Sequence, residues 1–237
     1  MYYYGFDPTY ILVLIGVFIT MAAQAKMRGA FQRYSAVRSG SGMTGQEVAR
    51  RILMANGIFD VAVEPVAGQL TDHYDPRKKV VKLSEVIYNS TSIAAVGVAA
   101  HECGHAIQDN RDYLPLRLRT AIVPIANLGS TLSFPMILIG IFLAGSGSYF
   151  GLNLINLGIL CFSLAVLFQL VTLPVEFDAS RRALQQLDAT GILPQEEGRQ
   201  ARAVLTAAAL TYVAAAASSL LQLLRLVILF GGNRRRD

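Results

Sequence analysis

The sequence predicts a mainly α-helical membrane protein with three to four transmembrane helices and a water-facing part that carries a metal motif. The chain is 53% hydrophobic and only 16% charged, which is typical of membrane proteins rather than of soluble domains. No charged residue occurs from Thr120 to Val175, a run of 56 positions, and two spans of about 20 residues with a short loop account for it. The five residues from His101 to His105 spell His-Glu-Cys-Gly-His, a pattern that on a helix binds zinc.

The first predicted transmembrane segment covers about residues 6–25. Its start carries the acidic residue Asp7, and the basic residues Lys26 and Arg28 follow directly after it. A cleaved signal peptide has the opposite layout, with positive charge before the apolar stretch. Residues 1–25 are therefore predicted to be an uncleaved N-terminal transmembrane anchor, and the positive-inside rule places the chain from residue 26 onward in the cytoplasm.

Residues 26–119 are predicted to form the first cytoplasmic part. They hold 13 lysines and arginines and 9 aspartates and glutamates, as a water-exposed domain does. Thr44 and Glu47 have the spacing of a capping box, and Gly57 follows the same apolar stretch. This pattern predicts a helix that begins after Thr44 and ends before Gly57.

A small β-hairpin is predicted between this helix and the metal motif. Two short stretches, 61–70 and 79–83, are rich in strand-forming residues and flank the turn 75–78. The outer strand of such a hairpin can pair with an extended peptide by strand addition. A hairpin that only covers the metal-binding helix is the equally simple interpretation.

Residues 120–175 are predicted to form a two-helix transmembrane hairpin. Its spans cover about 121–144 and 152–173, and Pro174 is expected to end the second of them. Residues 176–237 then return to the cytoplasmic side, because the chain has crossed the membrane an odd number of times before them.

The apolar stretch from Ala203 to Phe230 is predicted to be a membrane-associated helix. Arg225 lies inside it, and three arginines at positions 234–236 follow it. A full crossing places those arginines outside, against the positive-inside rule. The alternative is a helix that packs partly on the cytoplasmic part and partly along the membrane surface.

The helix that carries the metal motif is predicted to begin after Ser92 as its N-cap and to end near Asp109. Positions i and i+4 lie on the same face of a helix, so His101 and His105 point at one spot where a zinc ion can bind. Glu102 is placed to take a proton from a water molecule on that metal.

A catalytic zinc site usually has three protein ligands and one open position. No histidine follows His105 in the sequence, so the third ligand is expected to be a carboxylate. Glu176 is the first acidic residue after the two central spans, on the same side of the membrane as the motif, and Asp178 is its nearest rival. The other interpretation is that these charges only mark a solvated membrane boundary.

Several longer stretches of the chain resemble one known family. These are TGQEVARRIL, GQLTDHYDP, SIAAVGVAAHECGHAIQ, LPVEFDASRRAL and AALTYVAAA, which are distributed over most of the chain, from residue 44 to residue 216. They resemble the YugP-type neutral zinc metallopeptidases of bacterial membranes and, more distantly, the HtpX-type membrane proteases and the CAAX prenyl proteases. The resemblance implies a zincin-like, gluzincin-like catalytic domain merged with the transmembrane helices.

The resemblance also implies roles for individual residues. His101, His105 and Glu176 correspond to the zinc ligands, and Glu102 to the catalytic base. Residues 26–119 and 176–237 then supply the two catalytic parts, and the second of them contributes the third ligand.

One position departs from the pattern of the distant relatives. They have an aspartate four residues after the third ligand, where this chain has Ser180. Asp178 is the alternative partner for a zinc-bound histidine. His73 and Tyr74 are further candidates, as donors to the oxyanion of the reaction, although a histidine bonded within its own turn is the simpler interpretation of His73.

The function expected from the sequence is that of a membrane-bound, zinc-dependent metalloendopeptidase. It hydrolyses peptide bonds at the cytoplasmic surface of the bacterial cell (inner) membrane, by attack of zinc-bound water with help from Glu102. One alternative is an intramembrane site-2-type zinc protease, which needs an aspartate in a later span, and the two central spans contain none. The other is a non-enzymatic, zinc-stabilised scaffold subunit, which has no need of Glu102.

The expected partners are Zn²⁺, the lipid bilayer, and a protein or peptide substrate that is itself membrane-associated. No nucleic-acid partner is expected, because the basic residues cluster at the flanks of the spans, where anionic lipid accounts for them.

Overall fold

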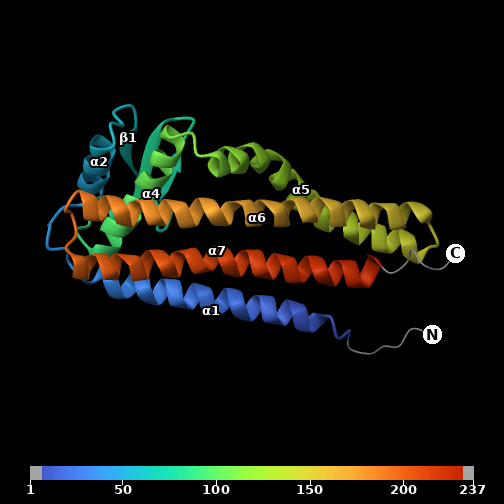
Figure 1. The fold of residues 1–237 in the computed structure, drawn as a ribbon. Coiled ribbons are helices and arrows are strands. Elements are labelled where there is room, and N and C mark those ends of the chain that lie inside the picture. Colours follow the sequence, from blue (N-terminus) through green and yellow to red (C-terminus); the bar gives the residue numbers. More distant parts are fainter. Residues whose placement is uncertain (1–6, 232–237) are drawn as a thin grey trace. The chain divides into compact units, whose positions relative to one another are not determined.

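A computed structural model describes residues 7–231 of the chain (Figure 1). Its elements are mostly helices, with one small sheet between α2 and α4 in the sequence. The helices are α1 (Tyr10–Ser35), α2 (Gly45–Ala55), α3 (Glu85–Tyr88), α4 (Ile93–Asn110), α5 (Leu114–Gly145), α6 (Tyr149–Ala189) and α7 (Gln195–Phe230); the strands are β1 (Ala62–Val66), β2 (His73–Asp75) and β3 (Val80–Ser84).

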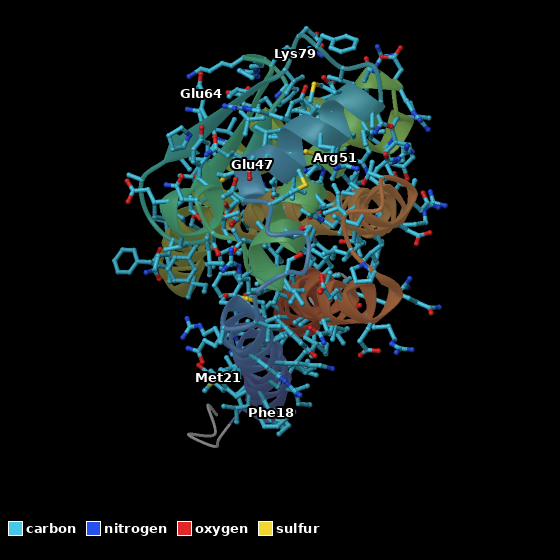
Figure 2. The ribbon with its side chains drawn as sticks, turned by 90° about the vertical axis from the view of Figure 1, so that its left-hand side faces the viewer. Phe18, Met21, Glu47, Arg51, Glu64 and Lys79 are labelled. Atoms are coloured by element: carbon cyan, nitrogen blue, oxygen red, sulfur yellow. The ribbon has the colours of Figure 1, made fainter. Side chains whose placement is uncertain are left out.

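Four of these helices, α1, α5, α6 and α7, are long and apolar enough to cross a membrane. Each has 26 to 41 residues, more than the ~20 that a hydrocarbon core requires. The large apolar side chains of α1 are exposed, as lipid-facing residues are: Phe18 and Met21 project outward in Figure 2 and are 74% and 67% exposed. The protein is therefore a mainly α-helical membrane protein, as the sequence predicts.

The expectation that Pro174 ends a helix is wrong, because α6 continues through Pro174 to Ala189. Proline removes one backbone donor inside a helix, at a cost of about 3 kcal/mol. The residues that follow pack tightly: Val175, Ala179 and Ala183 are completely buried, and this packing compensates for the lost hydrogen bond. As a result, Glu176 lies on a rigid helix rather than in a loop.

The chain divides into two compact units. The first, the membrane unit, comprises in the described part of the chain residues 7–22, 118–172 and 212–231. The second, the site unit, comprises Ala23–Arg117 and Leu173–Thr211. Every residue of the predicted metal site falls within the site unit.

In the membrane unit, α5 and α6 pack through glycines. A Cβ atom on Gly151 would lie 2.3 Å from the backbone nitrogen of Ala144, and one on Gly129 would lie 2.7 Å from the carbonyl oxygen of Cys161. Small residues allow helix backbones in membranes to approach closely and to gain van der Waals contact. The two helices, each long and apolar enough to cross a membrane, are therefore packed closely against each other.

Helices α1 and α7 run antiparallel in the membrane unit. Gly16 lies against Ser218, where an added Cβ would meet the serine Oγ at 2.7 Å. Further toward the start of α1, the Asp7 carboxylate accepts a hydrogen bond from Arg225 at 3.1 Å, and the Arg225 guanidinium lies 4.3 Å from the centre of the Tyr10 ring. The charge inside α7 is thus compensated within the unit.

The core of the site unit is formed by α2, α4 and the sheet. Val48 and Ile52 of α2 are completely buried, as are Val96 and Ala99 of α4 and Leu83 of β3. The capping box predicted at Thr44 is present: the Glu47 carboxylate accepts hydrogen bonds from the backbone N–H and the hydroxyl of Thr44, each at 2.8 Å. Gly57 follows α2 with a φ of 70°, as the predicted C′ residue requires.

The sheet has the strand order β1-β3-β2 and differs from the expected hairpin in one respect. β1 pairs with β3 in the parallel sense, with Ala62 opposite Val80, whereas the antiparallel partner of β3 is the short strand β2. The expected turn at 75–78 is present, and the Asp75 carboxylate accepts hydrogen bonds from the backbone of Arg77 and Lys78. A chain reversal between β1 and β2, where Gly68 has a φ of 104°, gives β1 its parallel direction.

Candidate metal centre

Helix α4 brings the metal motif into the interior of the site unit. Its first turn is capped as predicted: the Ser92 hydroxyl accepts a hydrogen bond from the backbone N–H of Ala95 at 3.2 Å. The approach to the motif is small and apolar and is buried almost throughout. Within the motif, Glu102 is 7% and His105 8% exposed, so both polar groups are held away from bulk water.

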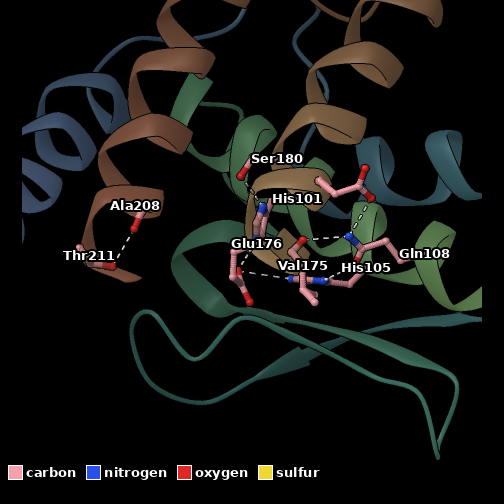
Figure 3. A network of polar contacts seen from close by, with 9 residues as sticks. His101, His105, Gln108, Val175, Glu176, Ser180, Ala208 and Thr211 are labelled. Atoms are coloured by element: carbon pink, nitrogen blue, oxygen red, sulfur yellow. Dashed lines mark hydrogen bonds and ion pairs between the residues drawn. The ribbon is translucent and has the colours of Figure 1, made fainter. Parts of the chain in front are cut away.

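The two histidines and Glu176 meet at one point, as Figure 3 shows. The imidazole rings of His101 and His105 lie with their centres 4.8 Å apart and almost perpendicular to each other. The Oε2 atom of Glu176 lies 3.3 Å from Nε2 of His101 and 3.7 Å from Nε2 of His105. The structure thus brings together three residues that are up to 75 positions apart in the sequence.

The geometry of these three residues fits a zinc ion. One ligand atom from each lies within 4.8 Å of the others. Around tetrahedral zinc, with bonds of about 2.1 Å to nitrogen and oxygen, neighbouring ligand atoms are about 3.4 Å apart. The two distances to Glu176 lie close to that value, and two imidazoles with one carboxylate form a donor set that zinc binds in hydrolytic enzymes.

The approach of α6 to α4 depends on Gly104. A Cβ atom at this position would lie 2.5 Å from the carbonyl oxygen of Ala179 and 3.1 Å from its Cα. No larger residue fits there unless α6 moves away, because real Cβ contacts are longer. Since Ala179 lies one turn beyond Glu176, this close contact sets how near the carboxylate comes to the two imidazoles.

Ser180 makes the contact to a histidine that the sequence left in doubt. Its hydroxyl oxygen lies 3.2 Å from Nδ1 of His101, so a hydroxyl takes the place of the carboxylate found in the distant relatives. Asp178, the alternative partner, contacts neither histidine directly. Its carboxylate accepts hydrogen bonds from Arg181, Arg182 and Gln108.

Gln108 is a site residue that the sequence analysis missed. Its side chain is completely buried, and its Oε1 lies 3.0 Å from Nδ1 of His105. Its Nε2 donates to the carbonyl oxygen of Val175 at 2.8 Å and to Asp178 at 2.9 Å. Its position three residues after His105, on the same helix face, was the available signal.

Glu102 lies beside the two histidines, with its carboxylate inside the fold. The backbone N–H of Tyr74 in β2 donates a hydrogen bond to it. Burial raises the pKa of this carboxyl to about 7, and the negative charges of Glu176 and Asp72 add to the effect while His101 opposes it. A cation held by the neighbouring ligands stabilises the carboxylate form and lowers this pKa again.

Side chains from the sheet edge form hydrogen bonds with the end of α4. The Tyr74 hydroxyl donates to the Asp109 carboxylate at 2.8 Å, and the Lys79 ammonium donates to the same oxygen at 2.7 Å. The Tyr74 hydroxyl is therefore already engaged with a carboxylate. His73 bonds within its own segment, through Nδ1 to the carbonyl oxygen of Thr71 at 2.7 Å.

The remaining polar group of the motif faces away from the metal centre. Cys103 is completely buried, and its thiol lies 3.5 Å from the Ala49 carbonyl oxygen on α2. Burial raises the pKa of this thiol, so the cysteine behaves as a small apolar residue.

Comparisons with known proteins show the family to which the chain is related. A family model described as "Putative neutral zinc metallopeptidase" matches residues 9–231. The "Putative membrane protease YugP" of Bacillus subtilis (strain 168) is 50% identical over 208 residues, which cover 85% of this chain and 90% of the relative. No solved structure matches the chain.

Two glycines of α4 offer a matched test of the helix contact. Gly104→Ala is expected to lower both the melting temperature and the zinc affinity, because its methyl group drives α6 away, at a cost of about 1–3 kcal/mol. Gly97→Ala serves as the control, since its Cβ would meet only Ala201 at 3.7 Å and the helix gains up to about 1 kcal/mol in propensity. Thermal unfolding and zinc titration of both variants measure the difference; equal behaviour contradicts the account.

Proposed function

The chain belongs to the family of neutral zinc metallopeptidases, and from this membership we propose that it is a membrane-bound, zinc-dependent metalloendopeptidase. It hydrolyses peptide bonds in proteins or peptides near the cytoplasmic surface of the bacterial cell membrane. The observation that carries the proposal is the convergence of His101, His105 and Glu176 beside the buried carboxylate of Glu102. A purely structural zinc site has no use for that additional carboxylate.

In this proposal His101, His105 and Glu176 hold the zinc ion. Both imidazoles must present an unprotonated Nε2 to the metal. The amide oxygen of Gln108 can only accept, so Nδ1 of His105 carries the proton and its Nε2 is free to bind. The hydroxyl of Ser180 can donate or accept, and it accepts from Nδ1 of His101 when Nε2 of that ring binds the metal. Bound there, zinc acts as a Lewis acid that makes a water molecule acidic and polarises a substrate carbonyl.

Glu102 is the proposed general base. Its carboxylate is held by the backbone N–H of Tyr74, which orients it next to the metal ligands instead of letting it turn to solvent. It takes the proton from the water that attacks the scissile carbonyl and later donates this proton to the departing amine. The same residue thus serves as base in the first step and as acid in the second.

The proposed location follows from the membrane helices and the charges beside them. The basic residues Lys26 and Arg28 lie on the part of α1 that belongs to the site unit, and basic residues remain on the cytoplasmic side. We therefore propose that the metal centre lies in the cytoplasm, close to the lipid surface. Membrane-associated proteins are the substrates that such a site reaches most readily.

The role of Glu102 is tested with Glu102→Gln. The variant is expected to keep its zinc and to lose about 100-fold to 10,000-fold in kcat, because the amide cannot accept the proton. Zinc content and cleavage of a casein or peptide substrate are measured on the purified protein. Cys103→Ala is the control from the same motif, since the thiol faces α2, and it should cleave normally. Wild-type turnover in Glu102→Gln would rule out the assignment.

The proposed orientation is tested with two introduced cysteines. Phe59 in the site unit and Tyr149 at the start of α6 are 80% and 84% exposed. A membrane-impermeant thiol reagent applied to cells with a permeable outer envelope should label Tyr149→Cys directly. Phe59→Cys should be labelled only after the membrane is opened. The two native cysteines add little background labelling, because Cys103 is buried and Cys161 is partly buried. Labelling of Phe59→Cys in sealed cells would place the metal centre outside.

A further inference from the structure

Gln108 joins the two helices that carry the proposed zinc ligands. It lies on α4, one turn after His105, and its side chain is completely buried. Its amide reaches across to α6, where it contacts Val175, the residue before Glu176, and Asp178, two residues after Glu176. One side chain therefore contacts a ligand on α4 and the segment that holds a ligand on α6.

The partners of the Gln108 amide fix its orientation. Nε2 lies between two acceptors, the Val175 carbonyl oxygen at 2.8 Å and the Asp178 carboxylate at 2.9 Å, and it can donate one hydrogen to each. Oε1 must then face His105, and as an oxygen it can only accept. The proton of His105 is thereby held on Nδ1, and the lone pair of Nε2 points toward Glu176.

We propose that Gln108 is a positioning residue that fixes both the protonated nitrogen of His105 and the separation of the α4 and α6 ligands. The inference rests on the proposed zinc ligands but not on the chemistry of peptide hydrolysis. A carboxylate at this position would also accept from His105, but it would repel the Val175 carbonyl and Asp178. A neutral amide is the group that satisfies all three neighbours.

Asp178 is itself held in place, which makes the amide contact rigid. It accepts from Arg181 and Arg182, and the Arg182 guanidinium lies 5.5 Å from the centre of the Tyr113 ring. The backbone N–H of Tyr113 donates to the backbone carbonyl oxygen of Gln108 at 2.9 Å. The contacts therefore form a closed ring from α4 to α6 and back to the end of α4.

The test compares Gln108→Leu with Gln186→Leu. Gln186 of α6 also makes a hydrogen bond to another segment through its amide, accepting at 2.7 Å from Asn56, the residue that follows α2, but it touches neither histidine. Zinc affinity, measured by competition with a chelator, is expected to fall about 10-fold to 100-fold in Gln108→Leu, the range for partners of metal-bound histidines. It should stay at the wild-type value in Gln186→Leu. The absorption spectrum of the cobalt-substituted protein should change only in Gln108→Leu.

A second measurement needs no variant at position 108. In zinc-loaded protein labelled with ¹⁵N-histidine, His105 should be protonated at Nδ1 and bound through Nε2. Substitution of His73 removes the signals of the third histidine, and the two histidines that remain should both show this pattern. Wild-type zinc affinity in Gln108→Leu, an equal loss in Gln186→Leu, or a His105 bound through Nδ1 overturns the inference. A protein that binds zinc as described but cleaves no peptide contradicts the proposed function and leaves the role of Gln108 intact.

Discussion

The close approach of α4 and α6 at Gly104 is the contact on which the metal centre depends. Without a side chain at this position, the Ala179 backbone can lie against α4, and the small residues on both helices fill the space around the contact. A difference of one methyl group is enough to separate two packed helices, since protein interiors have few voids. Because Glu176 and Ala179 share one rigid helix, the packing contact and the ligand geometry are fixed together.

The same packing buries several carboxylates, whose negative charge requires positive charge nearby. Glu102 of α4 and Glu176 and Asp178 of α6 are all buried in the site unit. Asp178 is balanced by Arg181 and Arg182. Glu102 and Glu176 have the two imidazoles as neighbours instead, and a divalent cation bound at the proposed site would supply the positive charge that two buried carboxylates require. Zinc binding and stability of the site unit are therefore expected to be coupled.

Local patterns in the sequence predicted most of the elements, and tertiary contacts account for the rest. The motif helix with its Ser92 cap and the long apolar helices follow from spacing and composition, which are properties of short stretches. The pairing of β1 was predicted in the wrong sense, since strand direction depends on how a distant chain reversal folds. Pro174 was expected to end α6 because the local rule ignores the packing of the residues after it. The Gln108 contact depends on which residues of α6 face α4, and only the folded structure shows this.

The donor set of the metal centre is the central claim, and X-ray absorption at the zinc edge of the purified wild-type protein measures it directly. The account predicts about four nitrogen or oxygen neighbours at about 2.0–2.1 Å, with the outer scattering of two imidazoles and no sulfur. A sulfur neighbour at about 2.3 Å would mean that Cys103 binds the metal. That result, or the scattering of a single imidazole, would contradict a site built from His101, His105 and Glu176.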